Sequence, residues 1–471
     1  MADNIDIVKG LAGLLDRDRI MTDPGDVAGY AVDGLEPAAV VFPSNTQEVA
    51  EVMKFACAEK LAVVPRGSGT KMGMGLPPAR LDLVLCTARM NHMKDVDSAN
   101  LTITAEAGVR FRDIQARLAT EEDRCYLPLS DLGVEEDDMI CSERSHSGTF
   151  LPLDPPLCEK ATLGGIIAAD TTGPRRLLYG LPRDRVLGVR FVTPEGEIVG
   201  AGGKTVKNVS GYDISKLMVG SMGSLGVICD ITCRLLPLPE KMETLFVRFT
   251  DLDRAMDLAD RISRTKLIPA ALEIMNGAAF QAAAAHGPNV EQEDFVLAMA
   301  LESFHEAVER MKRETLAMAD DMKALSTGLA NEDEHRRFWL GVSELGRQRN
   351  GQKLVTVKVH VPLSRWKIIT ALAAKTLKGT PYRMLSHAGS GVCLLHMEPA
   401  DSKAASSVLE ILFRACLQAE GNLTVLHAPA AWKKDLPVWG EPGSHMKVME
   451  NIKRELDPSG IMSPGRFAGG L

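Results

Sequence analysis

A glycine-rich turn directly after a short apolar run is the first place where this sequence could do chemistry. The run Leu61–Val64 leads into Pro-Arg-Gly-Ser-Gly-Thr at Pro65–Thr70, and Gly73 and Gly75 follow. Backbone N–H groups that converge in a small-residue turn can hold a diphosphate, because no bulky side chain obstructs its approach. The turn is neither a Rossmann fingerprint nor a Walker loop. Taken alone, it fits a phosphate cradle or a plain loop.

Histidines in the last third of the chain are candidate proton acceptors. His387 lies in the turn-like run Ser386–Gly391, and His396 follows. An imidazole in such a turn can serve as a general base, or it can simply hydrogen-bond to the backbone. His360 and His396 lie in apolar runs that are typical of strands, which favours structural roles for both. We therefore take His387 as the candidate catalytic base.

Two arginines could bind an anionic substrate. Arg347 and Arg349 are separated by one residue in Gly-Arg-Gln-Arg. A guanidinium fork matches a carboxylate in a bidentate manner, so these residues are candidates for a carboxylate clamp. The alternative is a solvated basic turn.

Composition excludes several classes of function. The 471 residues carry a net charge of -8, and only 5% are aromatic, which argues against a nucleic-acid partner. The nine cysteines are irregularly spaced, and only Cys229 and Cys233 lie close together, so we expect neither a disulfide framework nor a bound metal or iron–sulfur cluster. Met1–Gly10 lacks the apolar core of a secretory signal, and no run reaches the roughly 18 apolar residues of a membrane span. The prediction is a cytoplasmic protein without direct membrane insertion.

Helices and strands must position these groups, and their pattern indicates a mixed fold. The clearest helix start lies in Val40–Leu61, where Ser44 and Asn45 can cap the first turn and Gln47 and Glu48 can complete a capping box. Alternation and apolar runs predict strands at 81–85, 100–107, 186–193, 227–236, 271–275, 295–301, 354–361 and 392–397, and helices at 111–120, 251–266 and 303–326.

Changes in composition indicate where the domains begin and end. The glycine-dense first part closes at Pro237–Glu240, and longer helices follow from Lys241. We expect a first domain at 1–239, a second α+β domain at 240–450 with an antiparallel sheet plus helices, and a C-terminal tail at 451–471 that returns to the first domain. The acidic segment Ser130–Thr149 is expected to be a surface insertion, either plainly solvated or serving as a docking loop or flap.

Several motifs occur together in one order along the chain. After the turn at Pro65–Thr70 come Leu-Pro-Leu-Asp-Pro-Pro (151–156), Ala-Thr-Leu-Gly-Gly (161–165), Gly-Pro-Arg-Arg (173–176), Tyr-Gly (179–180), Arg-Asp (183–184), Val-Lys-Asn-Val-Ser-Gly-Tyr-Asp (206–213) and Gly-Ser-Met-Gly-Ser-Leu-Gly-Val-Ile (220–228). This ordered set resembles the vanillyl-alcohol oxidase/PCMH flavoprotein superfamily. Within it, the chain is most similar to the smaller FAD subunit of glycolate oxidase and to the FAD-linked D-lactate dehydrogenases. The resemblance covers roughly Val40–Pro239 and Asp457–Arg466.

The resemblance implies a PCMH-type FAD-binding domain of two subdomains, followed by a cap domain. It implies that Arg66, Gly67, Ser68, Gly69 and Thr70 wrap the FAD pyrophosphate. The other cofactor-binding positions that it implies are Pro152, Thr162, Gly164, Gly165, Gly173, Tyr179, Gly180, Asp184, Gly223, Gly226, Val227 and Ile228. No histidine lies in Arg66–Gly75, where covalent members often tether the flavin, so FAD is expected to be non-covalent.

The implied activity is oxidation of a small 2-hydroxy acid, such as glycolate or D-lactate, to the 2-oxo acid. Electrons would pass to an iron–sulfur partner subunit, beside a second FAD subunit, and the protein could lie peripheral to the inner membrane through these partners. The run at His387–Gly391 departs from the dehydrogenase pattern His-x-Gly-Asp-Gly-Asn-x-His, because Ser390 and Val392 replace Asp and Asn. A bound metal is therefore not expected, and a non-catalytic FAD subunit that relays electrons or stabilises a complex stays open.

Overall fold

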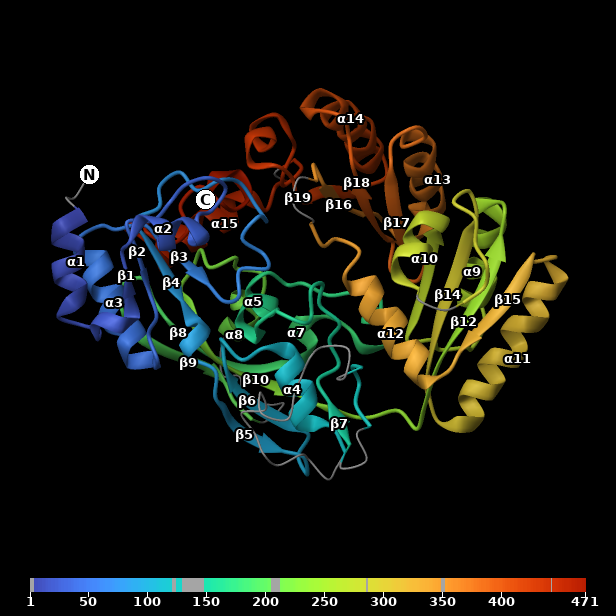
Figure 1. Ribbon diagram of the computed structural model, residues 1–471, viewed down its shortest axis with the longest axis horizontal. Coiled ribbons are helices and arrows are strands. Elements are labelled where there is room, and N and C mark those ends of the chain that lie inside the picture. The colour runs from blue at the N-terminus through green and yellow to red at the C-terminus, as the bar shows by residue number, and fades with distance from the viewer. Residues whose placement is uncertain are drawn as a thin grey trace.

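The computed structural model describes residues 4–120, 124–128, 148–204, 212–284, 287–348, 352–441 and 443–471. Figure 1 shows two α+β parts, with both ends of the chain in the part that carries α1 and α3. The second part is one large sheet with helices. The predicted α+β, PCMH-type fold class is confirmed by this architecture and by the structural neighbours reported below.

The first part begins with a small sheet that positions the glycine-rich turn. Its strand order is β1-β2-β4-β3, formed by β1 (Ile20–Met21), β2 (Ala39–Val41), β4 (Leu83–Cys86) and β3 (Val63–Arg66). Strands β2, β4 and β3 are parallel, and α3 (Thr46–Ala58) makes the crossover between β2 and β3. Asn45 caps α3 by accepting a hydrogen bond from the Glu48 N–H at 2.9 Å, as predicted. The turn therefore leaves the end of a buried parallel strand.

A second, antiparallel sheet forms the other half of the first part. Its order is β5-β6-β10-β8-β9, with β5 (Met93–Asp97), β6 (Thr102–Glu106), β10 (Val227–Arg234), β8 (Val186–Val192) and β9 (Ile198–Gly202). A short pair joins β7 (Thr149–Phe150) to β11 (Leu236–Pro237). The helices of this part are α1 (Asn4–Ala12), α2 (Pro24–Val27), α4 (Phe111–Leu118), α5 (Leu163–Ala168), α6 (Arg176–Tyr179), α7 (Pro182–Arg185) and α8 (Ile214–Met218), besides α3.

The second part is built on an eight-stranded antiparallel sheet of order β15-β12-β14-β13-β17-β18-β16-β19. The strands are β12 (Lys241–Phe249), β13 (Ala271–Asn276), β14 (Phe295–Ser303), β15 (Ser326–Ala330), β16 (Val355–His360), β17 (Tyr382–His387), β18 (Val392–Met397) and β19 (Asn422–His427). Its helices are α9 (Leu252–Ser263), α10 (Gly277–Ala283), α11 (His305–Asp321), α12 (Glu332–Ser343), α13 (Trp366–Thr376) and α14 (Ser402–Gln418). We call this part the cap.

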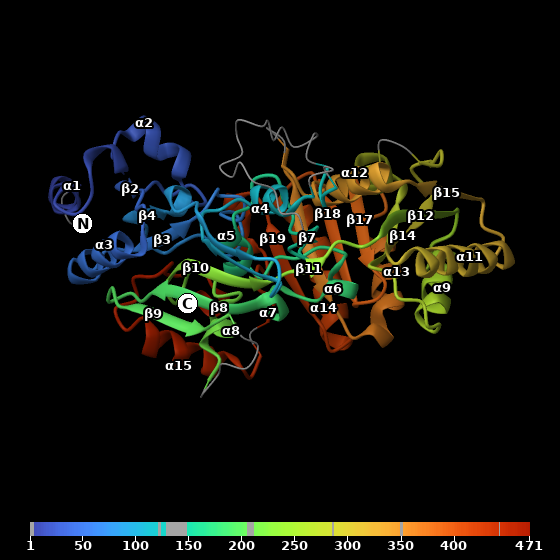
Figure 2. The same ribbon diagram turned by 90° about the horizontal axis from the view of Figure 1, so that it is seen from below.

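The two faces of the cap sheet bury different partners. One face packs with α9, α11, α13 and α14 in a core of its own. The opposite face contributes to a core that also contains Ile103 and Phe150 of the first part, together with Phe280 of α10 and Trp339 of α12. Figure 2 shows the cap strands running beside the first part. Because one apolar core continues across both parts, the pocket between them has packed walls on each side.

The C-terminal segment returns to the first part. Helix α15 (Met446–Leu456) precedes a parallel bridge between Met462 and Val63. Lys453 is buried there and donates to Asp457 at 2.5 Å and to the carbonyls of Ser224 and Met462 at 2.8 Å each. The tail thus completes the sheet that bears the glycine-rich turn.

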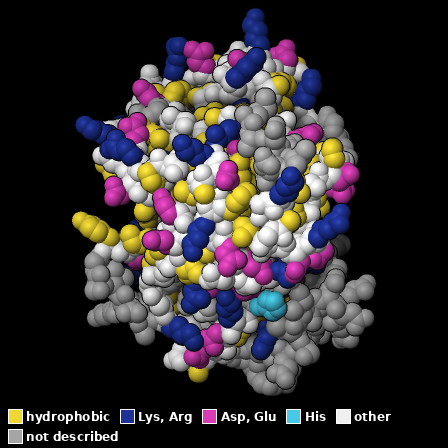
Figure 3. Space-filling model, turned by 90° about the vertical axis from the view of Figure 1, so that its left-hand side faces the viewer, with side chains coloured by type: hydrophobic (Ala, Val, Ile, Leu, Met, Phe, Trp, Pro, Cys, Tyr) yellow, Lys and Arg dark blue, Asp and Glu magenta, His cyan; other side chains and the backbone are white. Residues whose placement is uncertain are grey.

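The remaining sequence predictions differ from the structure mainly at element ends. A strand was expected at 100–107, and the structure has β6 at Thr102–Glu106, whereas the strand expected at 392–397 has the same bounds as β18 (Val392–Met397). The expected insertion Ser130–Thr149 lies outside the described residues except for its last two positions. On the surface that Figure 3 presents, cationic, anionic and hydrophobic side chains are interspersed without a patch of one charge.

Candidate active site

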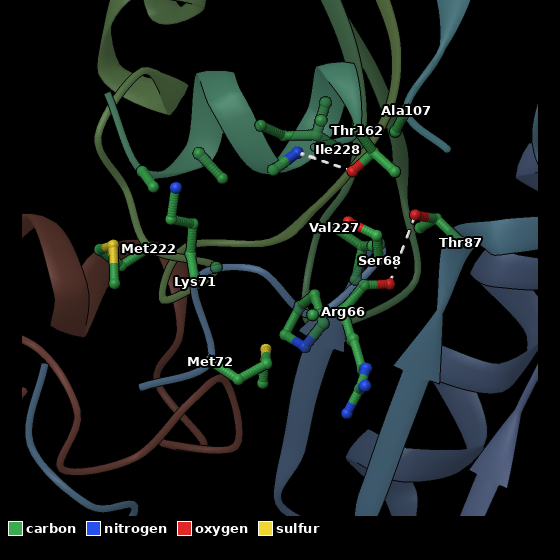
Figure 4. A pocket seen from close by; sticks show the side chains of 18 of the residues that line it. Arg66, Ser68, Lys71, Met72, Thr87, Ala107, Thr162, Met222, Val227 and Ile228 are labelled. Atoms are coloured by element: carbon green, nitrogen blue, oxygen red, sulfur yellow. Dashed lines mark hydrogen bonds between the residues drawn. The ribbon is translucent and has the colours of Figure 1, made fainter. Parts of the chain in front are cut away.

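A first cavity lies along the glycine-rich turn, and we call it the loop pocket. It has an empty volume of about 710 Å³. Figure 4 shows its wall, formed by the turn that follows β3, by helix α5 and by the segment that enters β10. Small residues supply much of the lining: Gly67, Gly69, Ala107, Gly164, Gly165, Ala168, Ala169, Gly223 and Gly226.

Two glycines explain why the chain can fold so closely around this cavity. A Cβ on Gly67 would lie 2.1 Å from the Thr162 hydroxyl oxygen, so the turn and the start of α5 approach to a distance that only glycine allows. Gly69 has a φ of +85°, in the region that L-residues rarely adopt. Thr162 accepts a hydrogen bond from Gly165 N–H at 3.3 Å. The sequence therefore produces a wall of backbone rather than of side chains.

Arg66, which also lines the loop pocket, is held in a fixed orientation by Tyr30 and Gly29. Its guanidinium lies 4.4 Å from the centre of the Tyr30 ring, and Nη1 donates to the Gly29 carbonyl at 3.4 Å. Its own carbonyl accepts from the Thr87 hydroxyl at 3.4 Å, as drawn in Figure 4. A stacked guanidinium keeps its charge in place for an anionic ligand.

Most of the cofactor residues expected from sequence come together here. The loop pocket is lined by Arg66, Gly67, Ser68, Gly69, Thr70, Thr162, Gly164, Gly165, Gly223, Gly226, Val227 and Ile228. Gly173 lines the neighbouring pocket instead. Pro152, Tyr179, Gly180 and Asp184 line neither. Asp184 instead accepts from Leu181 N–H at 2.8 Å, which fixes the turn that starts α7.

A second cavity lies between the first part and the cap, and we call it the interdomain pocket. Its empty volume is about 1490 Å³, and it shares Gly69, Thr70 and Lys71 with the loop pocket. The cap contributes apolar side chains of three elements, Trp339, Leu385 and Leu394. Asp154 lines the side of the first part, where burial raises the pKa of its carboxyl. The two cavities therefore adjoin at Gly69–Lys71.

One row across the cap sheet brings polar groups to this pocket. Thr356 on β16 is in register with His396 on β18 and with His427 on β19, and all three line the pocket. Thr356 and His396 are hydrogen-bonded, with 3.1 Å between the hydroxyl oxygen and Nδ1. His427 Nε2 is buried and has no hydrogen-bond partner among the described residues.

The surroundings keep both imidazoles neutral at neutral pH. Burial lowers the pKa of His396 to about 4, and Arg383 acts in the same direction. Burial also lowers the pKa of His427, and the Lys433 ammonium adds to the effect. A neutral imidazole with an unused nitrogen can accept a proton.

The catalytic residues expected from sequence are placed differently from these histidines. His387 ends β17, is only 3% exposed, and pairs through Nδ1 with Glu273 at 2.6 Å, lining neither pocket. Arg347 does line the interdomain pocket, but it pairs with Glu159 at 2.7 Å and also with Glu344. Arg349 lies outside the described residues. No local motif marks His427, because its neighbours on the wall come from other strands.

A buried charged network joins the first part to the cap behind this pocket. Arg175 pairs with Glu302 at 2.6 Å, and Tyr179 donates to Glu302 at 2.5 Å. His335 lies 3.2 Å from Glu302 and 3.0 Å from Arg175. Burial alone would raise the pKa of Glu302, but Arg175 and the hydrogen bonds from His335 and Tyr179 lower it to about 2. Tyr179, expected to contact the cofactor, thus takes part in interdomain pairing.

Metal and membrane features are absent from the described part of the chain. No group of three or more histidine, cysteine or acidic side chains is positioned there to hold a metal ion. No helix within those ranges has the length and apolar content needed to span a bilayer.

The residues of the loop pocket fit a flavin dinucleotide. The pocket is lined by backbone and small side chains, a Cβ at Gly67 would collide with Thr162, and the stacked guanidinium of Arg66 belongs to the lining residue set. Such a wall suits a diphosphate with attached rings. Together with the adjoining interdomain pocket, it defines a flavin-dependent oxidoreductase of the PCMH-type fold. The FAD binding domain model matches residues 37–128 and 142–202, and the model for the C-terminal domain of FAD linked oxidases matches residues 238–467.

Sequence relatives agree over nearly the whole chain. D-lactate dehydrogenase of Archaeoglobus fulgidus is 30% identical, across 92% of this chain and 91% of the relative. Glycolate oxidase subunit GlcD of Bacillus subtilis is 28% identical, across 92% and 89%. D-2-hydroxyglutarate dehydrogenase of Xanthomonas citri is 25% identical, across 95% and 94%. The chain belongs to the FAD-linked oxidase family and binds FAD, as the motifs predicted.

Solved structures support the same fold. A substrate-bound p-cresol methylhydroxylase matches with a TM-score of 0.74 at 15% identity, covering 99% of this chain and 97% of the other. An alkyldihydroxyacetonephosphate synthase matches with a TM-score of 0.71 at 16% identity, covering 98% and 86%. At such identities the likeness establishes the architecture only.

Proposed function

We propose that this chain oxidises a small 2-hydroxy acid, such as glycolate or D-lactate, to the 2-oxo acid. The observation that carries the proposal is that the two pockets adjoin at Gly69, Thr70 and Lys71, with neutral imidazoles on the cap side and the FAD-binding wall on the other. Glycolate, D-lactate and D-2-hydroxyglutarate, named for the relatives, are all 2-hydroxy acids. Bound FAD supplies the acceptor for the hydride of the carbon that bears the hydroxyl.

The hydroxyl proton needs an acceptor on the pocket wall. We assign this role to His427, because it lines the interdomain pocket, carries a nitrogen without a partner among the described residues, and has a lowered pKa. His387, the base expected from sequence, remains a competing candidate. Its hydrogen bond with Glu273 gives it a structural role whatever its part in the reaction.

The pocket wall can also exclude water from the reacting atoms. Trp339, Leu385 and Leu394 form an apolar surface beside the histidine row. An apolar wall strengthens the attraction between a bound carboxylate and nearby cations. The residues available to bind the substrate carboxylate include Arg347, as expected from sequence, although its guanidinium is already paired with Glu159 and Glu344.

The same proposal includes a partner protein that accepts the electrons. We propose an iron–sulfur partner subunit and a second FAD subunit, in line with the relative that is named as a glycolate oxidase subunit. A cytoplasmic location, at the inner membrane through these partners, belongs to this proposal. We also propose that FAD is held non-covalently, since no histidine or cysteine occurs between Arg66 and Gly75.

Anaerobic mixing of the FAD-loaded chain with a panel of hydroxy acids tests the proposal. Glycolate, D-lactate, L-lactate and D-2-hydroxyglutarate are each added, and loss of the oxidised-flavin absorption band is recorded. At least one of them should bleach the band with saturation. An oxidised spectrum with every acid, in a chain that supports turnover once its partners are present, would leave the non-catalytic FAD subunit as the better account. That alternative is favoured by the departures at Ser390 and Val392 and by the buried pairing of His387.

A further inference from the structure

Lys71 lies where the two pockets meet. It follows the glycine-rich turn, lines both the loop pocket and the interdomain pocket, and is half-buried. In Figure 4 its side chain extends from the turn toward helix α5. Its Nζ donates one hydrogen bond, to the Pro156 carbonyl at 3.0 Å. An ammonium has three donors, so two remain for a ligand.

Lys71 differs from the cations Arg347 and Lys433 in its counter-charges. Arg347 is paired with Glu159 and Glu344, and Lys433 is paired with Asp33 at 2.6 Å. Lys71 forms no direct ion pair with any described residue. A half-buried cation without a counter-charge is costly, and an anionic ligand beside it would remove that cost.

We infer that Lys71 is the specificity-determining cation of the site, and that its ammonium binds the carboxylate of the hydroxy acid at the junction of the two pockets. The inference rests on the proposed function. A carboxylate bound there would lie between the FAD-binding wall and the histidine row. The site would then accept acids and reject the corresponding neutral alcohols, because an alcohol leaves the ammonium unpaired.

The ionisation of Lys71 gives this inference a distinctive pH signature. Burial lowers the pKa of Lys71 to about 8, while Glu344 and Cys158 act in the opposite direction. Above pH 8 the empty site therefore loses its positive charge. A bound carboxylate favours the charged form, so binding must take up a proton at high pH.

The other groups around the pocket do not share this signature. Burial raises the pKa of Cys158 to about 12, and the lowered pKa values of His396 and His427 keep both imidazoles neutral above pH 7. The guanidinium of Arg347 has its pKa raised by hydrogen bonds to Glu344 and Glu159 and stays charged. Asp154 and Glu344 are acids, and Lys160 is an exposed cation on the rim. Lys160 therefore serves as a control cation.

Oxalate binding to the FAD-loaded chain tests the inference apart from turnover, because oxalate has no hydroxyl-bearing carbon to oxidise. The dissociation constant is measured from the perturbation of the flavin absorption band at pH 7.0 and at pH 9.5. For the wild type we expect it to rise about 10-fold per pH unit above pH 8. Lys71→Met should weaken binding at pH 7 by at least about 10-fold and abolish the pH dependence, whereas Lys160→Met should change it by less than about 2-fold.

Lys71→Arg keeps the test decisive if the Met variant loses FAD. Arginine stays charged at pH 9.5, so this variant should bind oxalate almost equally at both values of pH. Wild-type affinity and an unchanged pH profile in Lys71→Met, or an unaltered pH profile in Lys71→Arg, would overturn the inference. Failure of every hydroxy acid to reduce the flavin, with oxalate still bound through Lys71, would overturn the proposed function and leave the anion site in place.

Discussion

The two walls of the active-site space are built by different means. The loop pocket is formed by a continuous turn and by small residues that let backbone approach backbone, as at Gly67 and Thr162. The histidine row of the interdomain pocket is formed by side chains on β16, β18 and β19, which meet only through sheet register. A pocket wall made of backbone can therefore be recognised from a glycine-rich motif in the sequence. A row of side chains across a sheet comes from distant strands, so no sequence motif marks it.

Replacing His427 tests most strongly whether the histidine row of the interdomain pocket is catalytic. We expect His427→Asn to slow reduction of the bound FAD by the best hydroxy acid about 10²–10⁴-fold, the usual contribution of a general base. Because its pKa is lowered, the wild-type rate at saturating acid should be level between pH 6.5 and pH 8 and fall at lower pH as the imidazole becomes protonated. Stopped-flow absorbance measures both effects.

Two other histidines provide the controls for this variant. His360 lies exposed at the end of β16, and His360→Asn should reduce FAD at the wild-type rate. His387→Asn should mainly lower the free energy of unfolding, because it leaves Glu273 buried without its partner. If the rate instead collapsed in His387→Asn and persisted in His427→Asn, the assignment made from sequence would be correct and the one made from the pocket wall wrong.

The buried network that joins the two walls should give the next largest effect. Glu302→Gln leaves Arg175 buried without its counter-charge, and we expect the free energy of unfolding to fall by about 3–5 kcal/mol. The pKa of Glu302 is lowered from 4.5 to about 2, so its stabilisation is complete above pH 4.5 and is lost as pH falls toward 2.

Urea unfolding at pH 6 and at pH 3 measures this dependence. The difference between wild type and Glu302→Gln should shrink at the lower pH. A difference that stayed constant between the two values of pH would show that Glu302 is not stabilised as a carboxylate by this network.

A smaller effect is expected from crowding the backbone wall. Gly67→Ala places a Cβ 2.1 Å from the Thr162 hydroxyl oxygen, so the turn must shift. Overpacking of this kind costs about 1–3 kcal/mol, which corresponds to about 5–150-fold weaker FAD binding. Fluorescence titration of the apoprotein with FAD measures it. Gly200→Ala is the matched control, because nothing lies within 4 Å of a Cβ at that position, and equal FAD affinity in both variants would contradict the proposed wall.

The smallest effect concerns the helix that the sequence indicated most clearly. Asn45→Ala removes the cap of α3, in which Asn45 accepts from Glu48 N–H, and should cost about 1 kcal/mol of unfolding free energy. FAD affinity should stay at its wild-type value, because Asn45 lines neither pocket. Chemical denaturation of this variant measures the loss of unfolding free energy, and FAD titration measures its affinity for the cofactor.

What could be predicted from sequence follows the same division. The cap of α3 and the strand before the turn depend on local signals, and twelve of the seventeen cofactor residues that the family resemblance implies line the loop pocket. Tyr179 and Asp184 belong to motifs of the family, but the structure uses them for an interdomain hydrogen bond and for the turn before α7. His427 and Lys71 could not be selected, because their importance arises from which strands and loops face one another across the pocket. Arg347 was found by its residue type, yet only the fold shows that two acids neutralise it.

A crystal structure of the chain with FAD and oxalate both bound would test the central claim most directly. The account predicts FAD density along Arg66–Thr70 and the start of α5, with oxalate in the interdomain pocket between Lys71 and His427. FAD bound away from the glycine-rich turn, or oxalate seated beside His387 instead of on the histidine row, would contradict it.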